Sequence, residues 1–253
     1  MDMVKLSIRD LSFIYRDGSR ALRGINLDIL ANELFVLFGP SRSGKTTLLR
    51  MLNRLSDLHE DTTRNGTILF NDHDIFQRDI NVIKLRRSIS MVFATPTPLP
   101  GSIRENMVYG LKMAGMKKQE ELDRRVETGL RQAALWDEVK DRLEQSAFAL
   151  SGGQKQRLCL ARSLALEPEV ILLDNPTSGL DPISTTIVEE SLADLKNNYT
   201  IIMVPHSVQQ AARIADRAGF MLDGELIEIG YPAQIFLAPQ DQRTEDYVTG
   251  RFG

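Results

Sequence analysis

The feature that most constrains this chain is the apolar run LFVLF at residues 34–38, followed directly by the glycine-rich segment GPSRSGKTT. Five consecutive apolar residues are typical of a strand that is buried on both faces of a parallel sheet. An amphipathic helical pattern begins at Leu48. The glycine-rich segment matches G-x-x-x-x-G-K-[ST] through Gly39, Gly44, Lys45 and Thr46. A strand, this segment and a helix in that order predict a loop that binds the phosphates of a nucleotide.

The composition of the loop explains how it would bind an anion. Backbone N–H groups turn inward at the glycines, and the following helix presents the positive end of its dipole. Lys45 adds a full charge near the outer phosphates, and Thr46 offers a hydroxyl to Mg²⁺. The residues expected to bind the nucleotide in this loop are Gly39, Pro40, Ser41, Arg42, Ser43, Gly44, Lys45, Thr46 and Thr47.

The remaining apolar patterns predict an α/β fold. Buried-type runs recur at 90–93, 170–174 and 200–204, and helical patterns lie between them, as in parallel βαβ units. Helical periods there include Leu48, Leu52 and Leu55, and later Ile183, Ile187, Ser191 and Leu195.

Two other regions differ from this alternation. Alternating apolar residues near positions 4–8, 25–29 and 67–70 predict an antiparallel β subdomain, and Asp-Gly within GFMLDGELIEIG predicts a hairpin. Helix follows helix within 95–158, which predicts a helical insertion that begins at the proline cluster ATPTPLPG.

Composition limits the compartment and the partners. The chain has 253 residues, 42% of them hydrophobic and 26% charged, which allows one large or two small domains. A net charge of −3 gives no support for binding to nucleic acid. The single cysteine, Cys159, fits a reducing compartment, and no apolar run approaches the roughly 20 residues that span a bilayer. We therefore expect a cytoplasmic protein that reaches a membrane only through a partner.

The run VILLD ends in Asp174, at the edge of the sheet where a carboxylate would support the Mg²⁺ shell of a bound nucleotide. Asn175 follows, and its amide cannot take up a proton near neutral pH. Thr46 and Asp174 are thus the expected metal-binding residues.

A second motif, LSGGQ, occupies residues 150–154. Ser151 and Gln154 have the spacing of a capping box, which predicts a helix start. Two adjacent glycines, Gly152 and Gly153, weaken a helix but expose N–H groups that could meet an anion.

Taken together, GPSRSGKTT, LSGGQ, ILLDNPTSGLD and the histidine of VPHS resemble the ATP-binding subunits of ABC transporters over essentially the whole chain. The longer stretches AALWDEVKDRL, LSGGQKQRLCLARSLALEPEV, LDPIST and RTEDYVTGRFG are similar to the phosphate-import branch of that family. The resemblance implies one ABC domain over residues 1–253, with a P-loop NTPase core and antiparallel β subdomain at 1–94 and 159–253. The helical subdomain would be 95–158.

The resemblance also implies roles for individual residues. Two copies would enclose two ATP molecules with Mg²⁺, each bound by the P-loop of one chain and by Ser151, Gly152, Gly153 and Gln154 of the other. Tyr15 matches the aromatic residue that stacks on adenine, and His206 matches the switch histidine near the γ-phosphate. The catalytic set it implies is Lys45, Asp174, Asn175, His206, Ser151 and Gly153.

The chain departs from the family pattern at three positions. Asn175 replaces the glutamate that polarises the attacking water, Ala94 replaces a glutamine, and Arg42 replaces a glycine of the P-loop. These departures predict that ATP binding is retained and hydrolysis is weakened.

Three functions stay open at this point. The first is the ATPase subunit of an importer of inorganic phosphate, a dimer beneath two integral membrane permease subunits on the inner face of the cell membrane. The second is an ATP-binding switch or the degenerate half of a heterodimer. The third is an ABC ATPase that acts on something other than a transporter.

Overall fold

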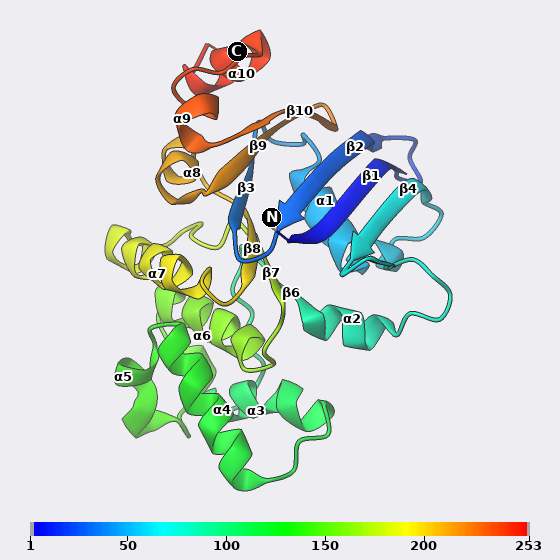
Figure 1. The fold of residues 1–253 in the computed structure, drawn as a ribbon. Coiled ribbons are helices and arrows are strands. Elements are labelled where there is room, and N and C mark those ends of the chain that lie inside the picture. The colour runs from blue at the N-terminus through cyan, green and yellow to red at the C-terminus, as the bar shows by residue number, and fades with distance from the viewer. Residues whose placement is uncertain (1–2, 252–253) are drawn as a thin grey trace.

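The central layer is a six-stranded sheet in the order β10-β9-β3-β8-β7-β6, seen edge-on in the computed structural model, which describes residues 3–251 (Figure 1). All of its strand pairs are parallel except β9 with β10. Every residue of β3, β7 and β8 is buried, as their continuous apolar runs predict. The strands are β3 (Leu34–Phe38), β6 (Ile89–Val92), β7 (Val170–Asp174), β8 (Thr200–Val204), β9 (Arg217–Leu222) and β10 (Glu225–Gly230).

A second, antiparallel sheet has the order β2-β1-β4-β5. Its long strands alternate between buried and more exposed residues, since one face packs on the core. The strands are β1 (Val4–Ile14), β2 (Arg20–Leu30), β4 (Thr63–Phe70) and β5 (His73–Asp74). The expected combination of a mostly parallel sheet with an antiparallel β subdomain is confirmed.

Helix α1 (Lys45–Leu52) lies between the two sheets (Figure 1). Alternate residues of β3 face opposite sides: Phe35 and Leu37 pack with α1 and the antiparallel sheet, while Leu34 and Val36 pack with the helices beyond. Because α1 begins at the P-loop lysine and its buried face belongs to the core, packing of the core also fixes the P-loop.

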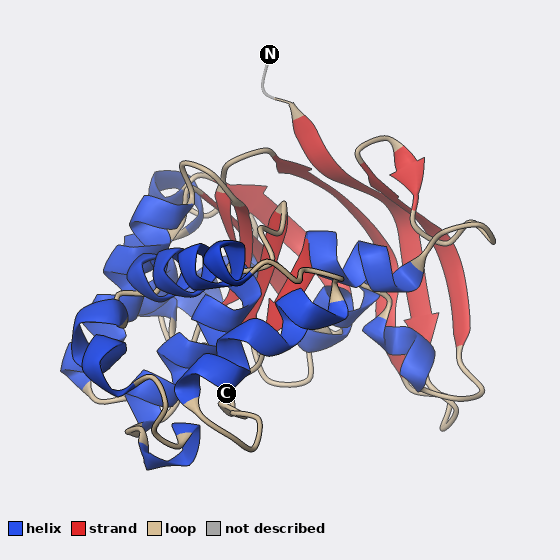
Figure 2. Ribbon diagram, turned by 90° about the horizontal axis from the view of Figure 1, so that it is seen from below, coloured by secondary structure: helices blue, strands red, loops and turns tan. Residues whose placement is uncertain are grey.

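The helices gather at one end of the molecule and the long antiparallel strands at the other (Figure 2). The helices of the insertion are α3 (Ile103–Met113), α4 (Gln119–Gln132), α5 (Trp136–Val139) and the start of α6 (Gly152–Leu164). The boundary predicted at residue 158 falls inside α6. The other helices are α2 (Val82–Ser88), α7 (Pro182–Leu195), α8 (Val208–Ile214), α9 (Pro232–Ile235) and α10 (Gln242–Val248). Single 3₁₀ turns occupy 55–58, 140–142 and 147–149.

Three local predictions need correction. The strand expected at 90–93 ends at Val92, and Phe93 is 45% exposed because the chain leaves the sheet there. Leu55 does not continue α1, since Arg54 adopts a left-handed φ of 59° that ends the helix. On α7 the buried face contains Val188, and Ile183 is 74% exposed.

The predicted hairpin is confirmed, with Asp223 and Gly224 between β9 and β10. The last two residues of the C-terminal motif RTEDYVTGRFG lie outside the described residues. Among the described residues, none of the helices combines the length and the apolar character needed to cross a membrane.

Candidate nucleotide-binding site

A cavity of about 630 Å³ lies at the P-loop. It opens beyond the carboxyl end of β3. Its walls come from the end of β1, the turn into β2, the P-loop and the ends of β7 and β8. The lining residues are Tyr15, Asp17, Ser19, Arg20, Ala21, Ser41, Arg42, Ser43, Gly44, Lys45, Thr46, Thr47, Asn175 and Val204.

The backbone of the loop requires glycine at two positions. Gly39 has φ of 140°, and a Cβ there would lie 2.0 Å from the carbonyl oxygen of Met221. Gly44 has φ of 96°, and its Cβ would lie 2.3 Å from the carbonyl oxygen of Ala21. Arg42 also adopts a left-handed φ, 67°, which glycine accepts at much lower cost. The loop geometry therefore persists although a side chain occupies this third position.

The Lys45 ammonium group lies inside the loop. Its Nζ donates to the carbonyl oxygens of Gly39 (2.9 Å) and Pro40 (2.6 Å) and to Ser43 Oγ (3.1 Å). Burial lowers the pKa of Lys45 to about 8, against the opposing attraction of Asp174. A desolvated cation that lacks a directly paired carboxylate is poised to gain from an incoming anion.

Thr46 and Asp174 lie next to each other, as their predicted role requires. Thr46 Oγ1 donates to Asp174 Oδ1 at 3.1 Å. Burial raises the pKa of Asp174, and the hydrogen bond from Thr46 opposes that rise. Residues 3–251 contain no group of three or more His, Cys, Asp or Glu side chains able to share a metal ion. This donor pair fits Mg²⁺ bound with a nucleotide, because that ion takes one or two protein oxygens and completes its shell with phosphates and water.

Tyr15 stands at the cavity wall where the resemblance expects an aromatic ring. Its hydroxyl lies 3.0 Å from Thr47 Oγ1, and its ring contacts Phe13 edge-on at a centroid distance of 4.9 Å. His59 is exposed and meets the same ring edge-on at a centroid distance of 5.4 Å. Phe13 and Thr47 thereby fix the orientation of the tyrosine ring.

Asn175 enters the cavity at its inner end. Its φ is 49°, and its backbone N–H donates to Val204 at 2.9 Å. His206 and Ala94 do not line the cavity: His206 is exposed just after β8, and Ala94 is half-buried beyond β6. The single chain thus brings together the P-loop, Tyr15 and Asn175, and leaves the histidine at the margin.

The LSGGQ segment does not line the cavity. Ser151 caps α6 in the predicted capping box, accepting from the backbone N–H of Gln154 at 3.2 Å. A Cβ on Gly153 would lie 2.4 Å from Ser184 Oγ, whereas one on Gly152 would meet nothing within 4 Å. Gly153 is therefore needed for packing of α6 on α7, while Gly152 is free of such contacts within the chain.

An ion pair between Arg157 and Glu138 stabilises the start of α6. Gln154 Nε2 donates to Glu138 Oε2 at 2.7 Å, and Arg157, which is 3% exposed, donates to Glu138 Oε1 at 2.6 Å. Burial acts to raise the pKa of Glu138, but the bonds from Arg157 and Gln154 leave it below its usual value. Sequence reasoning did not single out Glu138 or Arg157, because the two residues meet only after α5 and α6 pack.

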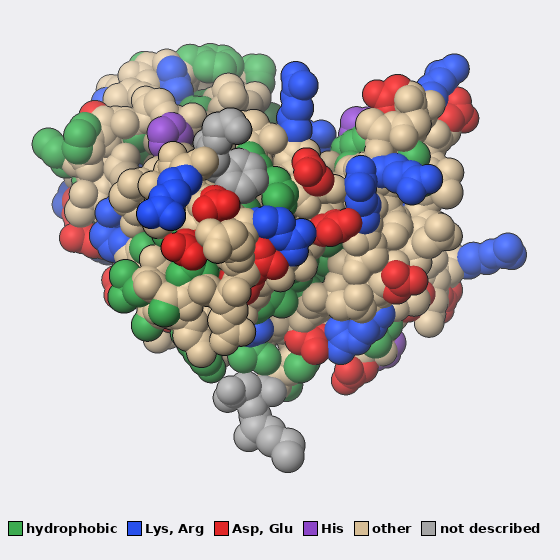
Figure 3. Space-filling view, turned by 90° about the horizontal axis from the view of Figure 1, so that it is seen from above, with side chains coloured by type: hydrophobic (Ala, Val, Ile, Leu, Met, Phe, Trp, Pro, Cys, Tyr) green, Lys and Arg blue, Asp and Glu red, His purple; other side chains and the backbone are tan. Residues whose placement is uncertain are grey.

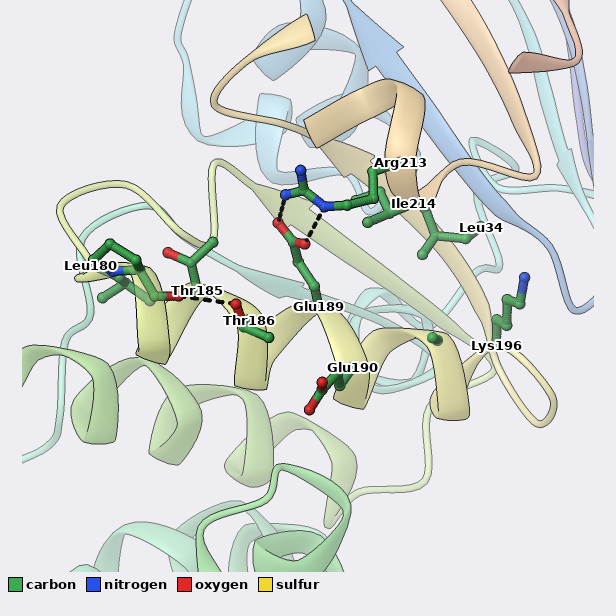
Figure 4. A pocket seen from close by; sticks show the side chains of 11 residues that line it. Leu34, Leu180, Thr185, Thr186, Glu189, Glu190, Lys196, Arg213 and Ile214 are labelled. Atoms are coloured by element: carbon green, nitrogen blue, oxygen red, sulfur yellow. Dashed lines mark hydrogen bonds and ion pairs between the residues drawn. The ribbon is translucent and has the colours of Figure 1, made fainter. Parts of the chain in front are cut away.

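Another cavity, of about 710 Å³, lies between α7 and α8 (Figure 4). Glu189 on α7 points toward α8 and forms a forked ion pair with Arg213, with distances of 2.6 and 2.8 Å (Figure 4). Glu190 also lines this cavity. Its two carboxylates balance its two cations, Lys196 and Arg213, whereas the P-loop cavity has three cationic side chains and one carboxylate in its wall, so the P-loop cavity remains the candidate phosphate site. Neither Glu189 nor Arg213 was predicted from the sequence.

One face of the molecule carries charges of both signs. On the face in Figure 3, Lys and Arg side chains are interspersed with Asp and Glu side chains.

The fold and the site together define a P-loop nucleotide-binding protein of the α/β class. Residues 22–178 match the sequence model of the family described as ABC transporter. The chain belongs to this family, and its fold is the ABC ATPase fold.

Close relatives match along the whole chain. Phosphate import ATP-binding protein PstB 1 of Streptococcus agalactiae is 50% identical over 248 residues, which cover 98% of each chain. Phosphate import ATP-binding protein PstB 2 of Lactiplantibacillus plantarum is 51% identical with the same coverage. The resemblance seen in the motifs is therefore confirmed.

Solved structures agree on the fold. CbiO1 from Clostridium perfringens, part of the ABC transporter complex CbiONQ, superposes with a TM-score of 0.82 at 28% identity, covering 99% of this chain and 97% of that one. A bacterial Atm1-family ABC exporter with ATP bound gives a TM-score of 0.82 at 23% identity, covering 99% of this chain and 42% of that one.

Proposed function

We propose that this chain is the ATP-binding and ATP-hydrolysing subunit of an importer for inorganic phosphate. The observation that carries the proposal is the identity of 50% over 98% of the chain with proteins named for phosphate import. The P-loop cavity supports the nucleotide part of the proposal, because a half-buried lysine and glycines with no room for a Cβ suit the close approach of a polyphosphate.

Each part of the cavity has one task in ATP binding. The P-loop backbone and Lys45 bind the phosphates, and the Tyr15 ring stacks on the adenine. Thr46 and Asp174 bind Mg²⁺, which supplies charge neutralisation at the phosphate oxygens when it is present. Asn175, at the inner end of the cavity, orients the attacking water through hydrogen bonds.

The second half of each ATP site comes from another copy of the chain. Ser151 and Gly152 are both exposed at the start of α6, and a Cβ on Gly152 would meet no described atom within 4 Å, so both can meet a γ-phosphate presented by a partner copy. ATP closes this dimer and hydrolysis reopens it. Two integral membrane permease subunits convert that cycle into phosphate import, which places the chain at the cytoplasmic face of the membrane.

Hydrolysis is attenuated in this proposal. An amide orients water but cannot accept its proton, and a positioned general base contributes about 10²–10⁴ in rate. Asn175 therefore favours a second candidate function, an ATP-binding switch that closes readily and opens slowly. The switch could form a homodimer or the weaker half of a heterodimer.

Coexpression with a phosphate permease pair, followed by reconstitution into vesicles, tests the importer directly. We expect ATP-dependent uptake of labelled phosphate that Lys45→Ala abolishes. Association with the permeases but no uptake would favour the switch. Failure to associate with or without ATP would favour an ABC ATPase that acts outside transport.

A further inference from the structure

Gln210 on α8 has a buried amide, and each of its two polar atoms is hydrogen-bonded. The residue is 4% exposed. Its Oε1 accepts from the backbone N–H of His206 at 2.9 Å. Its Nε2 donates to Thr177 Oγ1 and to Glu189 Oε1, both at 2.9 Å. A buried amide with three partners is costly to disturb, since any partner left alone keeps its desolvation penalty.

The neighbours determine which way the amide points. A backbone N–H such as that of His206 can only donate, so it must face the amide oxygen. The Glu189 carboxylate is ionised and can only accept, because bonds from Arg213 and Gln210 keep its pKa below the usual value although burial acts to raise it. Glutamine meets both demands at once, and no other uncharged side chain of that length does.

The partners of Gln210 belong to the two loops that leave the sheet beside the nucleotide cavity. His206 follows β8, and Thr177 lies in the loop that follows β7 and contains Asn175. The Asn175 N–H already donates to the carbonyl oxygen of Val204 at the end of β8, where the second loop begins, and both of those residues line the cavity. Gln210 adds a second connection farther out, so the loops are tied at two points.

A third element supports this connection from behind. Glu189 points from α7 toward α8, and its forked pair with Arg213 fixes the carboxylate that accepts from Gln210 (Figure 4). The Glu189 side chain is 10% exposed, which reduces screening of the pair by water. The amide is thus bonded to three separate elements, all of them anchored.

We propose that Gln210 is a positioning residue for ATP hydrolysis, which keeps the His206 loop and the Asn175 loop in one register around the γ-phosphate. The inference rests on the proposed function, because it needs ATP in the P-loop cavity. Gln210 does not line that cavity, so it acts on the rate of hydrolysis and not on ATP affinity. Its bonds act through His206 and Thr177.

The test compares Gln210→Ala with Gln209→Ala, the same change at the exposed glutamine next to it. Single-turnover hydrolysis with protein in excess measures the rate even where it is slow. We expect Gln210→Ala to lower that rate by about tenfold to a hundredfold. The dissociation constant for ATP, measured by calorimetry, should stay within about twofold, and Gln209→Ala should match the wild type in both.

Two further variants separate positioning from packing. Gln210→Met keeps the length of the side chain but removes its bonds to His206, Thr177 and Glu189, whereas Gln210→Glu keeps an acceptor for the His206 N–H and places a second carboxylate beside Glu189. We expect both variants to hydrolyse slowly near neutral pH, and Gln210→Glu alone to recover relative to the wild type as the pH is lowered, because protonation restores a donor toward Glu189. An unchanged rate in Gln210→Ala or Gln210→Met would overturn the inference while wild-type hydrolysis leaves the proposed function standing. A wild-type chain that neither binds nor hydrolyses ATP would overturn both.

Discussion

At the scale of the residue, Lys45 shows how the P-loop prepares for an anion. The ammonium group is bonded to two backbone carbonyls and one hydroxyl, and burial lowers its pKa to about 8. In the unfolded chain the group keeps an ordinary pKa near 10.5. Between these two values the unfolded state binds more protons, so this residue makes the free energy of unfolding rise with pH in that range. Below pH 8 the desolvated ammonium group of Lys45 therefore lowers the free energy of unfolding. In return, the folded chain keeps a positive charge available for phosphate.

ATP binding should therefore be linked to proton uptake by Lys45. Bound phosphates favour the charged form and raise its pKa, so ATP affinity should fall by up to about tenfold per pH unit above pH 8. Calorimetry between pH 8 and 9.5 in buffers of different ionisation enthalpy measures both effects. Lys45→Met, which has no ammonium group, should bind weakly and without this pH dependence. Wild-type affinity that stays flat over the range would contradict the linkage.

Replacing Asn175 by glutamate should affect stability and turnover in opposite directions. Its φ of 49° lies in the left-handed region, which asparagine tolerates better than glutamate does. Asn175→Glu should therefore lower the free energy of unfolding by about 1 kcal/mol, measured by urea denaturation. The same change supplies a general base and should raise ATP turnover by about tenfold to a thousandfold. Asn175→Asp, with a shorter carboxylate, is the control for charge. Turnover that is already ordinary in the wild type and unchanged in Asn175→Glu would show that another group positions the water.

At the scale of the element, strands were easier to predict than the contacts between helices. The runs at 34–38, 170–174 and 200–204 match their strands residue for residue, because burial on both faces leaves no periodic ambiguity. The face of α7 was less accessible to pattern reading, since Ile183 continues the apolar period but is exposed at the helix start. Periodicity shows which residues share a face, and only tertiary packing decides how far along the helix that face is covered.

Parts of the candidate site could likewise be predicted from the sequence, and other parts could not. The P-loop and the Thr46–Asp174 contact could be expected from a local motif and from the edge of a parallel sheet. Gln210 could not, although a glutamine four residues after His206 at a helix start is close enough to accept from its backbone. The positioning role of Gln210 depends on Thr177 and Glu189, which belong to another loop and another helix.

The two glycines at the start of α6 should respond differently to the same substitution. Gly153→Ala puts a methyl group against Ser184 and should lower the free energy of unfolding by about 1–3 kcal/mol. Gly152→Ala meets no atom of the chain within 4 Å, so its stability should be unchanged or slightly raised. Thermal unfolding of the two variants measures the difference. Equal destabilisation would mean that α6 does not pack on α7 in this manner.

At the scale of the whole molecule, two cores meet on the two faces of one sheet. One core joins α1 to the antiparallel sheet, and the other joins the central strands to the helical insertion. The P-loop leads into α1, which packs in the first core, and the LSGGQ segment leads into α6, which packs in the second. One chain therefore presents these two motifs on different parts of its surface. A dimer in which each copy completes the other's site reconciles that separation with a single ATP-binding function.

This arrangement predicts an ATP-dependent dimer whose lifetime is set by hydrolysis. Because Asn175 lacks a basic group, ATP should keep the wild-type chain dimeric for long enough to be seen by size-exclusion chromatography. Gly152→Ala should weaken this dimer without unfolding the chain, since its methyl group would face the partner's phosphate.

Asn175→Glu should shorten the dimer's lifetime in proportion to its turnover. Adding Ala94→Gln should shorten it by more than the product of the single changes, because the glutamine that Ala94 replaces contacts the attacking water in the family pattern. A chain that stays monomeric with saturating Mg-ATP, yet hydrolyses it, would show that the site works without a partner copy.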